Sequence, residues 1–135
     1  MTQEEIKDIF KRLAEPMPVK WRVSPKIGGK LSVLAYLDAR MVQQRLDDIV
    51  GPENWANVYD SETGTATISI LINGEWVSKT DVGTESKVDK EKGKASDSFK
   101  RAAVLWGVGR FIYTDPKYSG KMLPLDQSGK YPTTA

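Results

Sequence analysis

Residues 63–83 read TGTATISILINGEWVSKTDVG, and this stretch decides the fold. Its first half alternates small or β-branched apolar side chains with hydroxyl side chains, which is the period of a strand with one buried face. The Asn73-Gly74 pair that follows is typical of a tight type I′ hairpin turn. A further strand fits before this stretch, beginning at Trp55. We therefore predict a three-stranded antiparallel meander from Trp55 to Gly83.

A long helix is predicted after the meander, from about residue 89 to residue 106. Apolar side chains recur along one side of it at the spacing of an amphipathic helix. They are Ala95, Phe99, Ala102, Ala103 and Trp106. Packed across the sheet, this stripe would form the core of an α+β domain. One helix cannot cover both faces and both edges of such a sheet, so the remaining surface favours self-association.

Two shorter helices and a hairpin are predicted before the meander. Thr2 and Glu5 form a capping box at the start of the first helix, and Pro16 ends it. The second helix begins after Asp38 and is closed by a Gly-Pro pair. Between the two helices, residues 19–34 contain two consecutive glycines, which indicate a turn or the tip of a hairpin.

The composition fits one small domain. The chain has 135 residues, of which 39% are hydrophobic and 28% are charged, and this is enough for one modest core. Beyond residue 113, prolines and glycines interrupt every periodicity. We predict a folded domain over residues 1–113 and a flexible C-terminal tail over residues 114–135. No stretch reaches the ~20 apolar residues of a membrane helix, so no membrane contact is expected.

Several classes of enzyme are excluded because the sequence contains neither cysteine nor histidine. Catalytic triads with histidine, cysteine nucleophiles and typical zinc sites all need one of these residues. Gly93-Lys94 resembles the end of a phosphate-binding P-loop, but Val88 and Ala95 stand where that motif needs Gly and Ser or Thr. The N-terminus also lacks the basic-then-apolar layout of a secretory signal, so a cytoplasmic protein is expected.

The charges are segregated along the chain. Residues 16–37 carry a net charge of +4 with no acid, residues 38–78 carry −5, and residues 79–110 carry +3. A fold that brings the two basic segments together would make a positive stripe suited to phosphates. An ordinary solvated surface is the alternative interpretation.

Basic and aromatic side chains of the two basic segments form the candidate nucleic-acid site. Lys100 and Arg101 are predicted on the side of the long helix away from its apolar stripe, where they offer a point charge and a fork to phosphate. Tyr36 lies near the end of the first basic segment. Single strands are bound by rings that stack on bases, beside cations that follow the backbone. The candidate set is Arg22, Lys26, Lys30, Tyr36, Lys94, Lys100 and Arg101.

A second hypothesis is a metal-dependent nuclease. Asp81, Glu85 and Lys87 lie at the end of the last predicted strand. Some Mg²⁺-dependent nucleases use such a carboxylate-x-lysine pattern, in which the acids bind the metal and the lysine orients the attacking water. Solvated charges at the end of a strand explain the same residues. Incubation of labelled DNA with Mg²⁺ would distinguish the two interpretations.

An ordered series of motifs runs from about residue 19 to residue 113. It comprises AYLDAR at residues 35–40, RL at residues 45–46, GPENW at residues 51–55, TDVG at residues 80–83, KASDSFKRA at residues 94–102 and GVGR at residues 107–110. The series resembles the Rad-fifty-two/twenty-two superfamily of single-strand annealing proteins. It is most similar to bacterial and phage members of the Sak and DdrA types.

The resemblance implies a β-meander crossed by a long helix, and a ring or helical oligomer that carries single-stranded DNA in an outer basic groove. It implies annealing of complementary strands in homologous recombination and double-strand-break repair, in a bacterial cell or a phage-infected host. No catalytic residue, cofactor or metal is expected. An end-protecting protein that binds DNA without annealing it is the alternative. A single-strand-binding protein that docks on the tail is a further candidate partner.

The resemblance also assigns residues by position. Lys100 and Arg101 match the paired cations on the long helix at the groove floor. Tyr36 matches a groove tyrosine, and Arg22 matches the arginine before it, across a longer loop. Val104 stands where the superfamily has a further cation on the helix, which implies a less positive groove.

Overall fold

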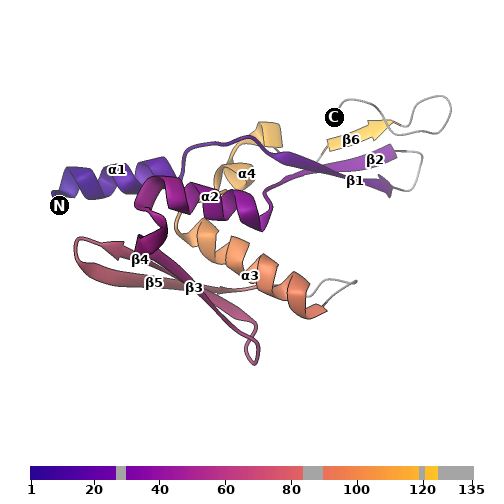
Figure 1. Cartoon of the computed structure of the whole chain (residues 1–135). Coiled ribbons are helices and arrows are strands. Elements are labelled where there is room, and N and C mark those ends of the chain that lie inside the picture. Colours follow the sequence, from indigo (N-terminus) through magenta and orange to yellow (C-terminus); the bar gives the residue numbers. More distant parts are fainter. Residues whose placement is uncertain (27–29, 84–89, 119–120, 125–135) are drawn as a thin grey trace.

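The computed structural model describes residues 1–26, 30–83, 90–118 and 121–124. Strands β3 (Trp55–Asp60), β4 (Thr65–Ile72) and β5 (Glu75–Val82) form an antiparallel sheet in the order β3-β4-β5. Helix α3 (Lys90–Leu105) lies across one face of this sheet, with α2 (Ala39–Val50) on its other side (Figure 1). The predicted α+β fold, with its meander and long helix, is confirmed.

The alternation in β4 determines which face of the sheet is buried. Four alternate apolar side chains of β4, Ala66, Ile68, Ile70 and Ile72, are buried, and they belong to one core cluster with the buried stripe of α3. Trp106 is 2% exposed, and its Nε1 donates a hydrogen bond to the carbonyl oxygen of Ile68 at 3.0 Å. At the β4–β5 turn, Asn73 and Gly74 have φ angles of 51° and 83°, as a type I′ turn requires.

Helices α1 (Gln3–Leu13) and α2 pack together beside this core. The capping box at Thr2 is present at the start of α1, as predicted. Arg45 of α2 donates from Nη1 to the carbonyl oxygens of Arg12 and Glu15, each at 2.9 Å. Because the last carbonyls of a helix lack partners within it, this arginine stabilises the end of α1.

The hairpin extends away from the helices (Figure 1). Strands β1 (Lys20–Lys26) and β2 (Lys30–Tyr36) pair antiparallel, and β6 (Lys121–Pro124) pairs with the other edge of β2. The sequence did not predict β6, since four residues are too few to show a periodicity. The boundary at residue 113 between a folded domain and a flexible C-terminal tail stays a prediction.

Three short elements complete the described fold. They are η1 (Pro52–Asn54), α4 (Phe111–Thr114) and η2 (Pro116–Tyr118). None of the helices within the described ranges combines the length and apolar character that crossing a bilayer requires.

Asp38 connects the hairpin to α2. One carboxylate oxygen accepts a hydrogen bond from the Met41 amide at 2.9 Å, and the other lies 2.6 Å from Lys20 Nζ. The hydrogen bond from Lys20, followed by that from Met41, lowers the pKa of Asp38 below its ordinary value of 3.8. The ionised carboxylate therefore stabilises the fold above pH 3.8, and this contribution is lost as the pH falls through the lower pKa of the folded state.

We expect Asp38→Ala to lower the free energy of unfolding by about 0.5–2 kcal/mol at neutral pH, the usual cost of losing an N-cap. Asp38→Asn keeps an acceptor for the Met41 amide and should lose much less, because an exposed ion pair contributes little. Urea unfolding at about pH 7 and about pH 2.5 measures both effects. The difference in free energy of unfolding between the wild type and Asp38→Ala should be smaller at the acidic pH. Equal losses in the two variants would contradict the capping role.

Candidate nucleic-acid interface

The apolar stripe of α3 fixes the direction of its basic side chains. Phe99 and Ala102 are buried against the sheet, so the intervening Lys100 and Arg101 point to the opposite side of the helix. The side chain of Arg101 is 48% exposed, and Lys100 is partly exposed. Both cations are therefore available to a ligand.

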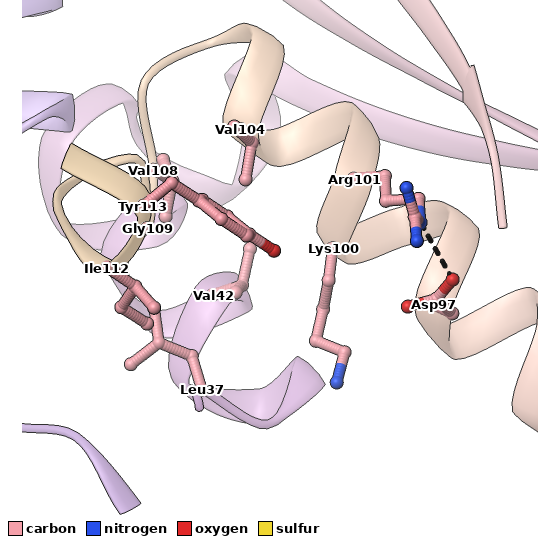
Figure 2. Close-up of a pocket in the computed structure, with 10 residues that line it drawn as sticks. All are labelled: Leu37, Val42, Asp97, Lys100, Arg101, Val104, Val108, Gly109, Ile112 and Tyr113. Carbon is pink, nitrogen blue, oxygen red and sulfur yellow. Dashed lines mark hydrogen bonds and ion pairs between the residues drawn. The ribbon is translucent and has the colours of Figure 1, made fainter. Parts of the chain in front are cut away.

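Lys100 and Arg101 line a hollow between α3, α4 and the start of α2 (Figure 2). Apolar side chains make up much of its wall, and cations lie at its α3 side. We call it the α3 hollow, and its lining residues are Leu37, Val42, Asp97, Lys100, Arg101, Val104, Val108, Gly109, Ile112 and Tyr113.

Leu37 joins the hairpin to this hollow, because it directly follows Tyr36 at the end of β2. The guanidinium carbon of Arg22 lies 5.1 Å from the centre of the Tyr36 ring, which is a cation–π contact. The structure thus brings Arg22 and Tyr36 together on the hairpin. It also brings Leu37 together with Lys100 in the α3 hollow.

The other candidate cations have different positions. Lys94 lies over the β3–β4 turn, because a Cβ added to Gly64 would come within 2.5 Å of Lys94 Nζ. Lys94 does not line the α3 hollow. Lys26 and Lys30 are paired across the hairpin at the ends of β1 and β2. Their side chains lie outside the part of the structure that is described.

An acidic side chain shares the α3 hollow with the cations. Asp97 Oδ2 lies 2.9 Å from Nε of Arg101, one helical turn away (Figure 2). This hydrogen bond and the charge of Asp97 raise the pKa of Arg101, which is already far above neutrality. The ion pair therefore orients the guanidinium without changing its charge. Its Nη groups take no part in this bond, so they can still donate to a ligand.

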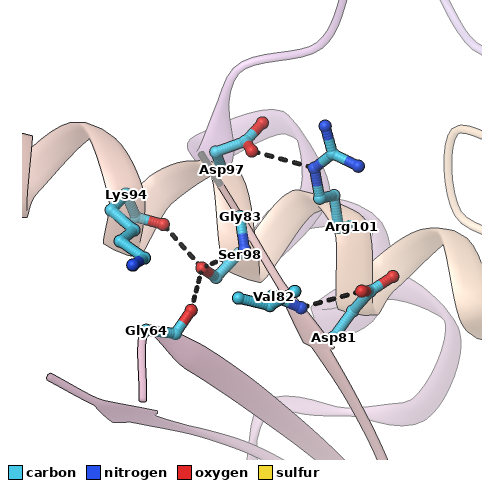
Figure 3. A network of polar contacts seen from close by, with 8 residues as sticks. All are labelled: Gly64, Asp81, Val82, Gly83, Lys94, Asp97, Ser98 and Arg101. Atoms are coloured by element: carbon cyan, nitrogen blue, oxygen red, sulfur yellow. Dashed lines mark hydrogen bonds and ion pairs between the residues drawn. The ribbon is translucent and has the colours of Figure 1, made fainter. Parts of the chain in front are cut away.

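A buried serine fixes α3 on the sheet, and sequence analysis missed it. Ser98 Oγ accepts from the Gly83 amide at 2.8 Å (Figure 3). It also lies 2.7 Å from the carbonyl oxygens of Gly64 and Lys94, and its one proton can bond to either. A Cβ added to Gly83 would come within 2.5 Å of the Ser98 backbone nitrogen. The end of β5 thus touches α3 just before Lys100.

Tyr113 is a second residue that the sequence did not single out for the site. Phe111 and Ile112 of α4 pack on the core, whereas Tyr113 is 76% exposed. The reason is that α4 is a single helical turn, in which positions two apart face nearly opposite directions. Tyr113 instead lines the α3 hollow and a second, adjoining hollow.

The second hollow is lined by Asp81, Arg101, Val104, Leu105 and Tyr113, and we call it the Asp81 hollow. Asp81 belongs to the nuclease hypothesis, and its Oδ1 accepts from the Val82 amide at 2.7 Å. Glu85 and Lys87, the other residues of that hypothesis, lie outside the described residues. Within the described ranges, no group of three acidic, histidine or cysteine side chains could hold a metal ion.

Comparison with known proteins identifies homologues of the chain. No family model matches it. The single-stranded DNA-binding protein DdrA of Deinococcus deserti is 36% identical over 122 residues, which cover 84% of this chain and 60% of that protein. DdrA of Deinococcus radiodurans is 33% identical over 122 residues, which cover 84% of this chain and 58% of that protein. The chain thus spans about three fifths of the length of these relatives, which are named as DNA-binding proteins and not as enzymes. As a homologue of the DdrA proteins, it belongs with them to the Rad-fifty-two/twenty-two superfamily.

Proposed function

We propose that the chain binds single-stranded DNA along a path from Arg22 and Tyr36 on the hairpin to Lys100 and Arg101 on α3. The observation that carries this proposal is the α3 hollow, which contains both helix cations and the residue directly after Tyr36. The names of the two DdrA relatives support the same ligand.

The lining of the hollow favours a single strand over a duplex. Leu37, Val42 and Ile112 give the site apolar surface beside its cations. An unpaired base can place a face on such surface while its phosphates lie on lysine or arginine, whereas a duplex presents phosphates and groove edges but stacks its base faces internally.

Annealing of complementary strands, in DNA repair and recombination, is the fuller form of this proposal. Two strands repel each other through their phosphates, and bound cations reduce that repulsion while base pairing supplies the driving force. This needs no catalytic group and no cofactor. Assembly into a ring or helix would repeat the weak contacts of each subunit along one strand.

An end-protecting protein that binds without annealing is the second candidate. Val104 favours it, because a neutral side chain lines the hollow where the superfamily pattern has a cation, so the site neutralises fewer phosphates. Pairing rates of complementary oligonucleotides, measured with and without protein, separate the two candidates. Acceleration supports annealing, and unchanged or slower pairing of bound strands supports end protection.

The dependence of affinity on salt tests the binding proposal. Three cations on the path should each release counterions from one phosphate, so the logarithm of the association constant should fall with a slope of about 2 against the logarithm of salt concentration. Fluorescence anisotropy of a labelled oligothymidine measures this slope, beside a duplex of equal length as a control. A salt-independent affinity, or equal affinities for the two DNA forms, would contradict the proposal. Mass photometry of the free protein gives the number of subunits.

A further inference from the structure

We propose that Tyr113 is a base-stacking residue, against whose ring an unpaired nucleobase lies while an adjoining phosphate contacts Lys100 or Arg101. This inference rests on the proposed binding of single-stranded DNA. It adds the position at which the protein contacts a base, which the cations of α3 do not supply.

The exposure of Tyr113 is the first observation. With 76% of its surface exposed, Tyr113 is the most exposed large hydrophobic residue among those described. The preceding residues of α4 anchor it, because Phe111 is buried and packs edge-on against Tyr118 with ring centres 5.0 Å apart. A ring held on an anchored helical turn is presented to a ligand with little loss of conformational freedom.

The second observation is the position of the ring between two hollows. Tyr113, Arg101 and Val104 line both the α3 hollow and the Asp81 hollow, so these side chains form the boundary between them. In Figure 2 the ring extends from α4 toward α3, with its hydroxyl on the side of Lys100. A base that enters either hollow therefore meets the ring.

The chemistry of the surroundings identifies the ligand. An aromatic ring with two cations on the neighbouring helix matches a base and its phosphate, because stacking tolerates every base and cations hold the backbone. The acids Asp81 and Asp97 border the two hollows and disfavour a second anionic group deep in them. We therefore expect the base to lie against the ring of Tyr113 and the adjoining phosphates to contact Lys100 and Arg101.

Three forms of the full chain test this role: the wild type, Tyr113→Phe and Tyr113→Leu. Loss of base–aromatic stacking weakens binding by about 5- to 140-fold, so Tyr113→Leu should bind oligothymidine more weakly by a factor in this range. Tyr113→Phe keeps the ring and should remain within about twofold. The salt slope should not change in either variant, because tyrosine neutralises no phosphate.

Photocrosslinking locates the contact independently of affinity. Oligonucleotides that contain 5-iodouracil should crosslink to the peptide carrying Tyr113 on irradiation of the wild-type complex, and this product should be absent from Tyr113→Leu. Circular dichroism and mass photometry of the variants check the fold and the assembly.

The possible failures are distinguishable. Wild-type protein that binds no single strand contradicts the proposed function itself. Salt-dependent wild-type binding that Tyr113→Leu leaves unchanged, with no crosslink at Tyr113, overturns the stacking role alone. A change of oligomer mass in Tyr113→Leu also overturns it, because the ring would then be a contact between copies of the chain.

Discussion

Replacing both Lys100 and Arg101 by alanine is expected to weaken the binding of single-stranded DNA by at least about a hundredfold. A hydrogen bond from a charged group contributes about 1.5–3 kcal/mol, and two of them correspond to about two to four powers of ten in the dissociation constant. Loss of Arg101 also leaves the Asp97 carboxylate without its guanidinium partner in the α3 hollow, where its charge would repel phosphate.

The double variant should retain its fold. Lys100 and Arg101 lie on the side of α3 away from the buried stripe, and the side chains of the Arg101–Asp97 ion pair are 48% and 32% exposed. Such surface pairs contribute only about 0.2–1 kcal/mol to stability. Urea unfolding and circular dichroism should therefore give values near those of the wild type, so that lost binding reports on the site.

A matched variant separates site contacts from net charge. Lys7 and Lys11 are exposed cations on α1, and replacing both by alanine removes the same total charge at another place. This control should change the affinity by less than about threefold, since exposed charges beyond a Debye length are largely screened. Anisotropy titrations of both double variants at one salt concentration make the comparison. Similar affinities in the two would contradict the assignment of Lys100 and Arg101 to the interface.

Local signals account for the elements that the sequence predicted well. The capping box at Thr2, the N-cap at Asp38 and the Asn73-Gly74 turn each act within four residues, and all three are present in the structure. Hydrophobic periodicity likewise placed α3 and the meander, because the same pattern that indicates a helix or strand also determines which side is buried.

Contacts between distant residues account for what the sequence could not predict. Whether Tyr36 and Lys100 share a surface depends on how the hairpin joins the helical layer, and no spacing along the chain records that. Lys94 belonged to the same basic segment as Lys100, yet it lies over the β3–β4 turn beside Gly64. Tyr113 was not identified as a site residue because a helix of one turn has no periodicity that would show which of its side chains are exposed.

Ser98 illustrates a signal that was present but ambiguous. A serine within a helix usually lies at the surface, and its hydroxyl often bonds to a carbonyl one turn earlier. Ser98 has that bond to Lys94, but it is also completely buried and reaches both Gly64 and Gly83. Its position beside the buried Phe99 could have indicated that it faces the sheet.

Gly83→Ala is expected to give the largest loss of stability among single changes near the site, about 2–6 kcal/mol. The added methyl group would lie 2.5 Å from the Ser98 backbone nitrogen and 2.7 Å from its Oγ, so α3 or β5 must move. Overpacking of this kind costs about 1–3 kcal/mol. The shift would also weaken the hydrogen bond from the Gly83 amide to Ser98 Oγ. A buried donor without a partner costs about a further 1–3 kcal/mol.

Gly74→Ala is the matched control, because Gly74 has a φ angle of 83° and open space around it. It introduces backbone strain of about 1–2 kcal/mol but no clash. Gly83→Ala should also weaken DNA binding, since the contact lies within one turn of Lys100 and Arg101, whereas Gly74→Ala should leave the affinity of the folded protein unchanged. Urea unfolding measures the stability of both variants, and fluorescence anisotropy measures their affinity for DNA. If the two variants lose the same free energy of unfolding and neither changes its affinity for DNA, α3 can shift away from β5 at no cost. The close approach at Gly83 then does not position the cations.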